Sequence, residues 1–475
     1  MHLWVMPMPG GAAGMPSPTP VEALVLPEVR IRSIWSAYWS QPASFKLTCF
    51  YVFFEYVRPQ QIYPILQVIP WALLSIGLAS VAFILEGARV RSRSMANWWL
   101  FAFSVVIVLS SILAEYPQVS LEGLPTQVNW LLAFFLIANT TTDQRKFFLF
   151  IVLFLLWSTK MSQHGMRAFV GGGGQASGAP GWFQNTGEFA LQMSIFVPLS
   201  LQFIVGLYPT LPKRTVALLA LLPISGVLSI VGSGSRGGLL ALACVGLWML
   251  MVSKRKVRGL VAIAVAAPLV WIAIPDYQKD RLSTAGTDNT SLSRLAYWKA
   301  GLEMANTHPL LGVGYGNWVP YYRDYYSSRE GGIIRYGERG QVIVEVAHNS
   351  FVEVMSQLGY TGLFLFLALL CSIWVINART RRLLPALGSA SRFLRHMSYG
   401  LDAGVIGFIV AGFFMSVAFY PFVWFQLGMT AALHVVAQRA AGTFPARTAS
   451  QSERSRKNAG WRTFRHAATA GIRRA

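Results

Sequence analysis

A histidine and an asparagine, His348 and Asn349, stand where a long polar stretch meets an apolar run that continues to Ile376. Histidine is the side chain best suited to proton abstraction near neutral pH, so His348 is a candidate general base. A histidine at a helix start can also serve only as a hydrogen-bonded cap, and Asn349 is a residue type favoured at the N-cap itself. The pair therefore predicts either a catalytic base beside a positioning asparagine or an ordinary capped helix start.

Arg236 interrupts an apolar stretch, within a break rich in glycine and serine at residues 232–238. A cation near a bilayer surface needs a partner or a function, and a guanidinium binds phosphate oxygens through paired hydrogen bonds. The glycines allow the backbone to bend and leave amide groups exposed to an anion. The alternative is an arginine that extends from a helix end to the membrane surface. Arg236 is therefore a candidate anion clamp.

Four other polar residues are candidates for the same site. Arg294 lies on a predicted surface helix, and Arg167 lies in a polar loop between two apolar runs. Both are candidate anion-binding residues. Asn185 and Glu188 stand at the entry to the next apolar run and, with Asn349, are candidate positioning residues.

Metal, nucleotide and nucleic-acid chemistry are not indicated. The sequence has no Asp-x-Asp, no His-x-x-x-His and no Walker motif, and its three cysteines lack metal-ligand spacing. We therefore predict no metal and no cofactor. A net charge of +21 would suggest nucleic acid for a soluble protein, but the Lys and Arg residues cluster in short connections between apolar runs. We predict no nucleic-acid partner.

The composition predicts an all-α polytopic membrane protein. The chain is 54% hydrophobic and 12% charged, whereas soluble domains carry about 25% charged residues. Runs of near membrane-spanning length recur along it and predict about twelve transmembrane helices in the lipid bilayer. The predicted spans are 44–57, 65–85, 97–114, 124–139, 147–160, 188–208, 214–231, 237–253, 258–275, 350–376, 399–419 and 421–440.

Charge in the connections predicts the orientation of these spans. Alternate connections are rich in Lys and Arg and belong in the cytoplasm, as do both termini. The stretch 276–347, between the ninth and tenth predicted spans, is then one large periplasmic loop. Residues 1–43 form a predicted disordered cytoplasmic leader, 44–440 the transmembrane domain, and 441–475 a basic cytoplasmic tail.

The spacing around the histidine resembles a known family. His348-Asn349, nine residues, then Gly359-x-x-Gly362 is similar to the pattern of the O-antigen ligase superfamily, and the Arg236 segment resembles its Arg-x3-Leu element. We interpret the two glycines as small residues that let this helix pack. The run Phe54–Gln60 resembles a branch of O-glycosylation ligases associated with exosortase systems.

The resemblance implies an inner-membrane glycan ligase that acts on the periplasmic face. Its donor would be a polyprenyl-pyrophosphate-linked glycan, and its acceptor a hydroxyl on a lipid, sugar or protein. His348 would be the base, and Arg236, Arg294 and Arg167 would bind the pyrophosphate. The long loop would close over the site and exclude water. The alternatives are an O-antigen-type polymerase that uses the same donor class, and a polysaccharide transporter or flippase.

Overall fold

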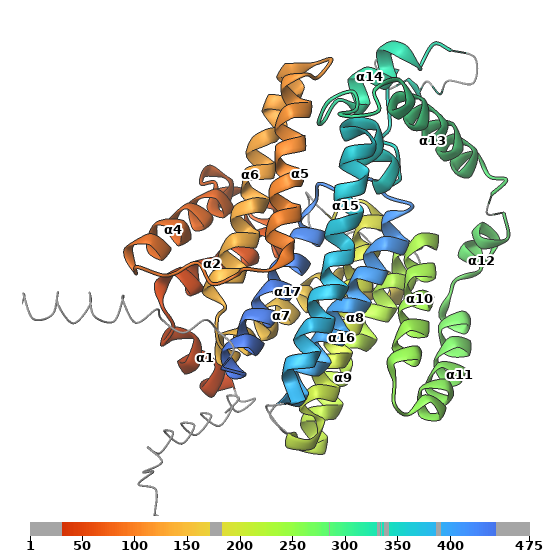
Figure 1. Cartoon of the computed structure of the whole chain (residues 1–475). Helices are drawn as coiled ribbons and strands as arrows, with labels where there is room; N and C mark the ends of the chain where they lie inside the picture. Colours follow the sequence, from red (N-terminus) through yellow and green to blue (C-terminus); the bar gives the residue numbers. More distant parts are fainter. Residues whose placement is uncertain are drawn as a thin grey trace, which may run out of the picture.

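The computed structural model describes residues 31–171, 183–284, 286–329, 333, 335–336, 342–385 and 391–442. Long helices form a bundle (Figure 1). The helices that lie in the twelve predicted ranges are α2 (Ala43–Tyr56), α4 (Trp71–Leu85), α5 (Met95–Ile112), α6 (Pro117–Thr140), α7 (Gln144–Val170), α8 (Thr186–Leu207), α9 (Lys213–Ser233), α10 (Arg236–Val252), α11 (Lys256–Ala273), α15 (Ser350–Leu383), α16 (Ser391–Gly412) and α17 (Pro421–Ala440).

Short elements connect these helices. Before α4 they are α1 (Ile31–Trp39), α3 (Pro59–Ile62) and η1 (Pro64–Val68), and η2 (Tyr208–Thr210) follows α8. The connection from α11 to α15 holds α12 (Asp276–Ser283), α13 (Asn289–Thr307), α14 (Trp318–Tyr325), β1 (Arg335–Tyr336) and β2 (Val342–Ile343). The two strands are antiparallel, with Arg335 opposite Ile343.

The chain is a polytopic membrane protein built almost entirely from helices. In the described part of the chain, seven helices are long and apolar enough to cross a membrane, namely α5, α6, α7, α8, α9, α11 and α15. The helices α4 and α10 are apolar but shorter. The total of twelve spans stays a prediction. One reason that α17 falls short of membrane-like hydropathy is its position, since it is buried along nearly its whole length and does not need a lipid-facing surface.

The bundle has two chemically different ends. The basic end carries the cationic connections at residues 86–94, 139–146, 208–214, 254–258, 379–385 and 391–395. The opposite end, which we call the loop end, is where α8, α10 and α15 begin, and it carries α12, α13 and α14 (Figure 1). Every candidate site residue from the sequence lies at or near the loop end. Because α7 ends at the loop end and α8, α10 and α15 begin there, the candidate residues at these helix ends lie on one side of the bundle.

The predicted leader is partly helical. Residues 31–39 form α1, and the Tyr38 hydroxyl donates a hydrogen bond to the Lys46 carbonyl at 3.1 Å. Ala37 and Tyr38 are buried against the bundle, which stabilises a helix where the sequence predicted disorder. Residues 1–30 and the predicted basic tail from residue 443 lie outside the described residues.

Candidate functional site

The helix α15 consists of two pieces that join at Gly359. The backbone there (φ 68°, ψ −173°) is not helical. A Cβ at this position would lie 2.6 Å from the Pro309 carbonyl oxygen, so both the backbone angle and the space require glycine. The packing role predicted for Gly362 fits, because a Cβ there would lie 2.2 Å from the Leu358 Cβ. For Gly359 the sequence interpretation was incomplete, since this residue breaks the helix.

Residues 309–316, which we call the strap, lie in the break of α15. The Tyr360 N–H donates to the Pro309 carbonyl at 2.8 Å, and the Val313 N–H donates to the Ser356 carbonyl at 2.9 Å. These bonds satisfy backbone groups that the break of the helix frees. The strap therefore ties the long loop to the first piece of α15.

The first piece of α15 begins with the histidine–asparagine pair. Asn349 is the N-cap, and its Oδ1 accepts hydrogen bonds from the N–H groups of Phe351 at 2.9 Å and Val352 at 3.1 Å, as the sequence predicted. His348 has a left-handed backbone (φ 51°). That conformation costs a non-glycine residue about 1–2 kcal/mol and persists only where its surroundings hold it.

The imidazole of His348 lies beside a carboxylate. Its Nε2 is 3.4 Å from the Glu345 Oε2, and the side chains are 19% and 27% exposed. The Tyr297 ring lies 6.5 Å from the imidazole, centroid to centroid. The preceding carbonyl, of Ala347, accepts a hydrogen bond from the Trp298 Nε1–H at 3.1 Å. The helix α13, which carries both aromatic residues, thus packs against the histidine turn.

Arg236 begins α10 directly after a tight turn. Gly234 ends α9 with a left-handed backbone (φ 68°), and Ser235 caps α10 by accepting from the Gly238 N–H at 3.2 Å. The Arg236 Nη2 donates to the Asp288 Oδ2 at 2.8 Å, with 19% and 26% of the two side chains exposed. This arginine is therefore paired with a carboxylate of the loop, and it is not a helix-end cation directed only to the membrane surface.

Asp288 is the N-cap of α13 and is held from two sides. Its Oδ1 accepts hydrogen bonds from the backbone N–H and the hydroxyl of Ser291. These Ser291 bonds, together with the Arg236 guanidinium, lower the pKa of the Asp288 carboxyl to about 2. The carboxylate is thus ionised at neutral pH and competes with any anion for Arg236.

A packed path joins the Arg236 turn to the His348 turn. A Cβ on Gly237 would lie 3.2 Å from the Phe414 side chain, and Phe414 contacts Phe413 at 5.4 Å between ring centroids. The Phe413 ring contacts Trp298 at 5.2 Å, and Trp298 bonds to Ala347. Packed side chains therefore connect the turn that carries Arg236 to the turn that carries His348.

Asn185 and Glu188 form a capping box at the start of α8. The Asn185 Oδ1 accepts from the Gly187 N–H at 2.8 Å, and the Asn185 N–H donates to the Glu188 Oε2 at 3.4 Å. The Glu188 carboxylate also interacts with the Tyr420 hydroxyl and with the charge of Glu353. A structural role thus accounts for both residues, and their role in positioning substrate stays a prediction.

The other two candidate arginines lie at the same end of the bundle. Arg294 is half-buried on α13, two turns beyond its N-cap. Arg167 is exposed in the last turn of α7. The end of α7 packs against the end of α9, because a Cβ on Gly232 would lie 2.7 Å from the Gly165 carbonyl oxygen, and α10 begins shortly after α9 ends. Their binding of pyrophosphate stays a prediction.

Glu345 and Asp288 were missed at the level of sequence. The loop carries equal numbers of acidic and basic residues, so its charge gave no reason to select either one. Two local patterns could have identified them. Glu345 precedes the histidine by three residues, and Asp288 stands three residues before Ser291, as an N-cap does.

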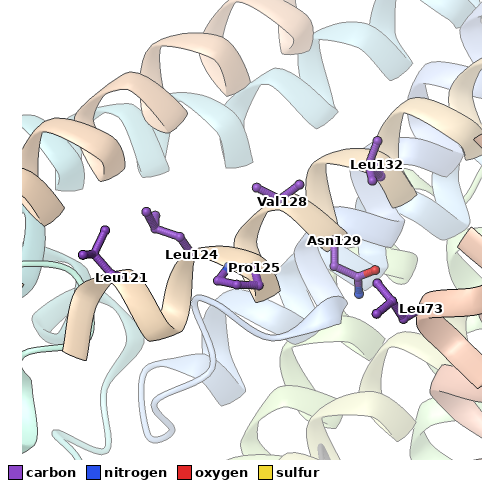
Figure 2. A pocket seen from close by; sticks show the side chains of 7 residues that line it. All are labelled: Leu73, Leu121, Leu124, Pro125, Val128, Asn129 and Leu132. Carbon is purple, nitrogen blue, oxygen red and sulfur yellow. The ribbon is translucent and has the colours of Figure 1, made fainter. Parts of the chain in front are cut away.

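Two further features bear on chemistry. Within the described ranges, no group of three or more His, Cys, Asp or Glu side chains could hold a metal ion. A groove of about 400 Å³ lies between α4 and α6, lined by Leu73, Leu121, Leu124, Pro125, Val128, Asn129 and Leu132 (Figure 2). Its one polar side chain, Asn129, donates to the Tyr51 hydroxyl at 2.8 Å. The groove contains none of the candidate site residues and is too apolar for acid–base chemistry.

Comparison with known families divides the chain into two parts. Residues 216–367 match a family model described as O-antigen ligase. Residues 29–190 match a family of unknown function (DUF5935). The Phe54–Gln60 run lies within this match, which assigns no activity to it. None of the curated proteins compared with the chain matches it. The first match includes Arg236, Asp288, the strap, Glu345 and His348.

Proposed function

Because residues 216–367 place the chain in the O-antigen ligase superfamily, we propose that it transfers a glycan from a polyprenyl-pyrophosphate donor to an acceptor hydroxyl. The family supports a membrane glycan ligase or polymerase in general terms. The observation that supports the finer proposal is the packed path from Gly237, next to Arg236, to Ala347, next to His348. Arg236 is the proposed cation that stabilises the leaving group, and His348 is the proposed base that takes the proton of the acceptor.

In the proposed reaction His348 takes the proton from the acceptor hydroxyl while its oxygen attacks the anomeric carbon of the glycan. The bond from that carbon to the pyrophosphate oxygen breaks, and its electron pair leaves with the pyrophosphate. Arg236 stabilises the negative charge that develops there, with Arg294 and Arg167 as further cations. A single displacement of this kind inverts the anomeric configuration.

We place the loop end in the periplasm and the basic end in the cytoplasm of a bacterial inner membrane. The short connections rich in Lys and Arg gather at the basic end, and such connections stay in the cytoplasm. A periplasmic site meets donors that have already crossed the membrane. The sequence predicted that the long loop closes over the site. The strap anchors residues 309–316 of this loop to α15. We therefore propose that only other parts of the loop move over the site.

A polymerase is the second candidate, since the same family supports it and the same residues would perform the same step. The two functions differ in the acceptor, which is a second polyprenyl-linked glycan for the polymerase. For the ligase it is a hydroxyl on another lipid, sugar or protein, and the Phe54–Gln60 resemblance favours an O-glycosylation ligase. Parallel assays with the two acceptor classes separate them.

Replacement of Arg236 by lysine should slow transfer by about a hundredfold, because lysine keeps the charge but not the paired donors. The measurement is the initial rate of transfer with purified protein and polyprenyl-pyrophosphate glycan. The matched control is Arg258→Lys at the basic end, which should leave the rate unchanged. Wild-type kinetics for Arg236→Lys would contradict the anion clamp.

Replacement of Asp288 by asparagine should tighten binding of the polyprenyl-pyrophosphate product. The variant removes the carboxylate that competes for Arg236, and asparagine still caps α13. A partly exposed ion pair contributes about 1 kcal/mol, so the inhibition constant of the product should fall about fivefold.

Asp276→Asn provides the matched control for Asp288→Asn. Asp276 is another loop carboxylate in an ion pair, with Lys279 at 2.9 Å. If both variants tighten product binding equally, the effect comes from net charge and not from competition for Arg236.

A further inference from the structure

The pair formed by Glu345 and His348 places a carboxylate beside one nitrogen of the imidazole. The His348 Nδ1 is buried, whereas its Nε2 lies 3.4 Å from the Glu345 Oε2. Both side chains are partly exposed, at 27% and 19%, so a substrate hydroxyl can approach them. Of the two ring nitrogens, Nε2 is therefore the one that faces the carboxylate.

The backbone of both residues is held by packed aromatic side chains. The Trp318 Nε1–H donates to the Glu345 carbonyl at 3.0 Å, and the Trp298 Nε1–H donates to the Ala347 carbonyl at 3.1 Å. Trp318 is 2% exposed and belongs to the aromatic cluster of the loop. His348 follows with a left-handed backbone (φ 51°). The separation is therefore set by the fold, which pre-organises the pair.

We propose that Glu345 is a positioning residue that holds the His348 ring and stabilises the imidazolium that forms when His348 takes the acceptor proton. This inference rests on the proposed function. Proton uptake converts a neutral imidazole into a cation, and a carboxylate next to the protonated nitrogen lowers the free energy of that state. The imidazole takes up the proton of the acceptor hydroxyl. The resulting cation carries an N–H on both ring nitrogens, with the Nε2–H beside Glu345, which remains ionised.

A crossed pair of substitutions separates charge from shape at this position. Glu345→Gln keeps the length but removes the charge, and Glu345→Asp keeps the charge but shortens the side chain. If Glu345 acts by charge, Glu345→Gln should lower kcat about tenfold, as loss of a charged hydrogen-bond partner does, with little change in the KM for the donor. Glu345→Asp should retain more activity than Glu345→Gln. The opposite order would show a role in packing alone and would overturn the proposal.

Two further variants make the test independent of folding. Glu303→Gln removes another loop carboxylate, which pairs with Arg329 at 3.7 Å, and should leave kcat unchanged. In a His348→Ala background, Glu345→Gln should cause no further loss, because a residue that acts through His348 has nothing left to act on. An additional tenfold loss in that background would overturn the proposal. If the wild-type protein transfers no glycan at all, the proposed function itself fails, whatever the variants do.

Discussion

His348→Ala inserts into the membrane at the wild-type level and transfers glycan about 10²–10⁴-fold more slowly, because that is the usual contribution of a general base. The residue lies before α15 and outside its hydrogen-bonded turns. Alanine at this left-handed position retains a backbone strain of about 1–2 kcal/mol, similar to that of histidine. The fold should therefore survive the substitution. The measurement is the single-turnover transfer rate at saturating donor.

The matched control for His348→Ala is His396→Ala. His396 lies on α16 at the basic end, where its Nδ1 is 2.7 Å from the Gln202 Oε1. This substitution should leave the transfer rate within about twofold of the wild-type rate, since His396 lies at the opposite end of the bundle from the proposed site. Full transfer by His348→Ala would remove the assignment of this residue as the base, even if the family assignment stands.

Gly359→Ala should abolish both activity and stable accumulation of the protein. Alanine at φ 68° carries the left-handed strain, and its Cβ would lie 2.6 Å from backbone atoms of the strap, which cannot move like a flexible side chain. The strain alone costs about 1–2 kcal/mol, and displacement of the strap adds the loss of its hydrogen bonds to α15. The measurement is the thermal unfolding temperature in detergent together with the amount of protein in the membrane.

Gly246→Ala is the control for Gly359→Ala. Gly246 lies inside α10, and a Cβ there would meet nothing within 4 Å. Because alanine favours a helix interior over glycine by about 1 kcal/mol, this variant should be as stable as the wild type or slightly more stable. A Gly359→Ala protein with wild-type unfolding temperature and activity would show that the break of α15 is not needed.

The positions of the helices could be predicted from the sequence, because local patterns determine them. Some ends were wrong, since α7 continues to Val170 beyond its predicted end at 160, and α16 begins at Ser391 before 399. Apolar runs give the positions of the helices, and Asn349 at the junction of polar and apolar residues gives the start of α15. The break at Gly359 could not be predicted in the same way. A glycine inside an apolar run fits a continuous packed helix equally well, and its partner Pro309 stands fifty residues earlier in the chain.

The candidate site was partly predictable for a similar reason. His348 and Arg236 stand out because each interrupts or borders an apolar run. Their partners, Glu345 and Asp288, lie in a loop where charged residues are common, so composition does not distinguish them. Their importance comes from contacts at 3.4 Å and 2.8 Å that only the folded chain creates.

The most direct measurement uses the full-length protein in liposomes with a labelled polyprenyl-pyrophosphate glycan and an acceptor that carries a free hydroxyl. Labelled acceptor and released polyprenyl pyrophosphate should form in equal amounts, with inverted anomeric configuration, and both should disappear in His348→Ala. Unchanged donor, or donor that moves across the bilayer without cleavage of its glycan–pyrophosphate bond, would contradict glycan transfer by this protein.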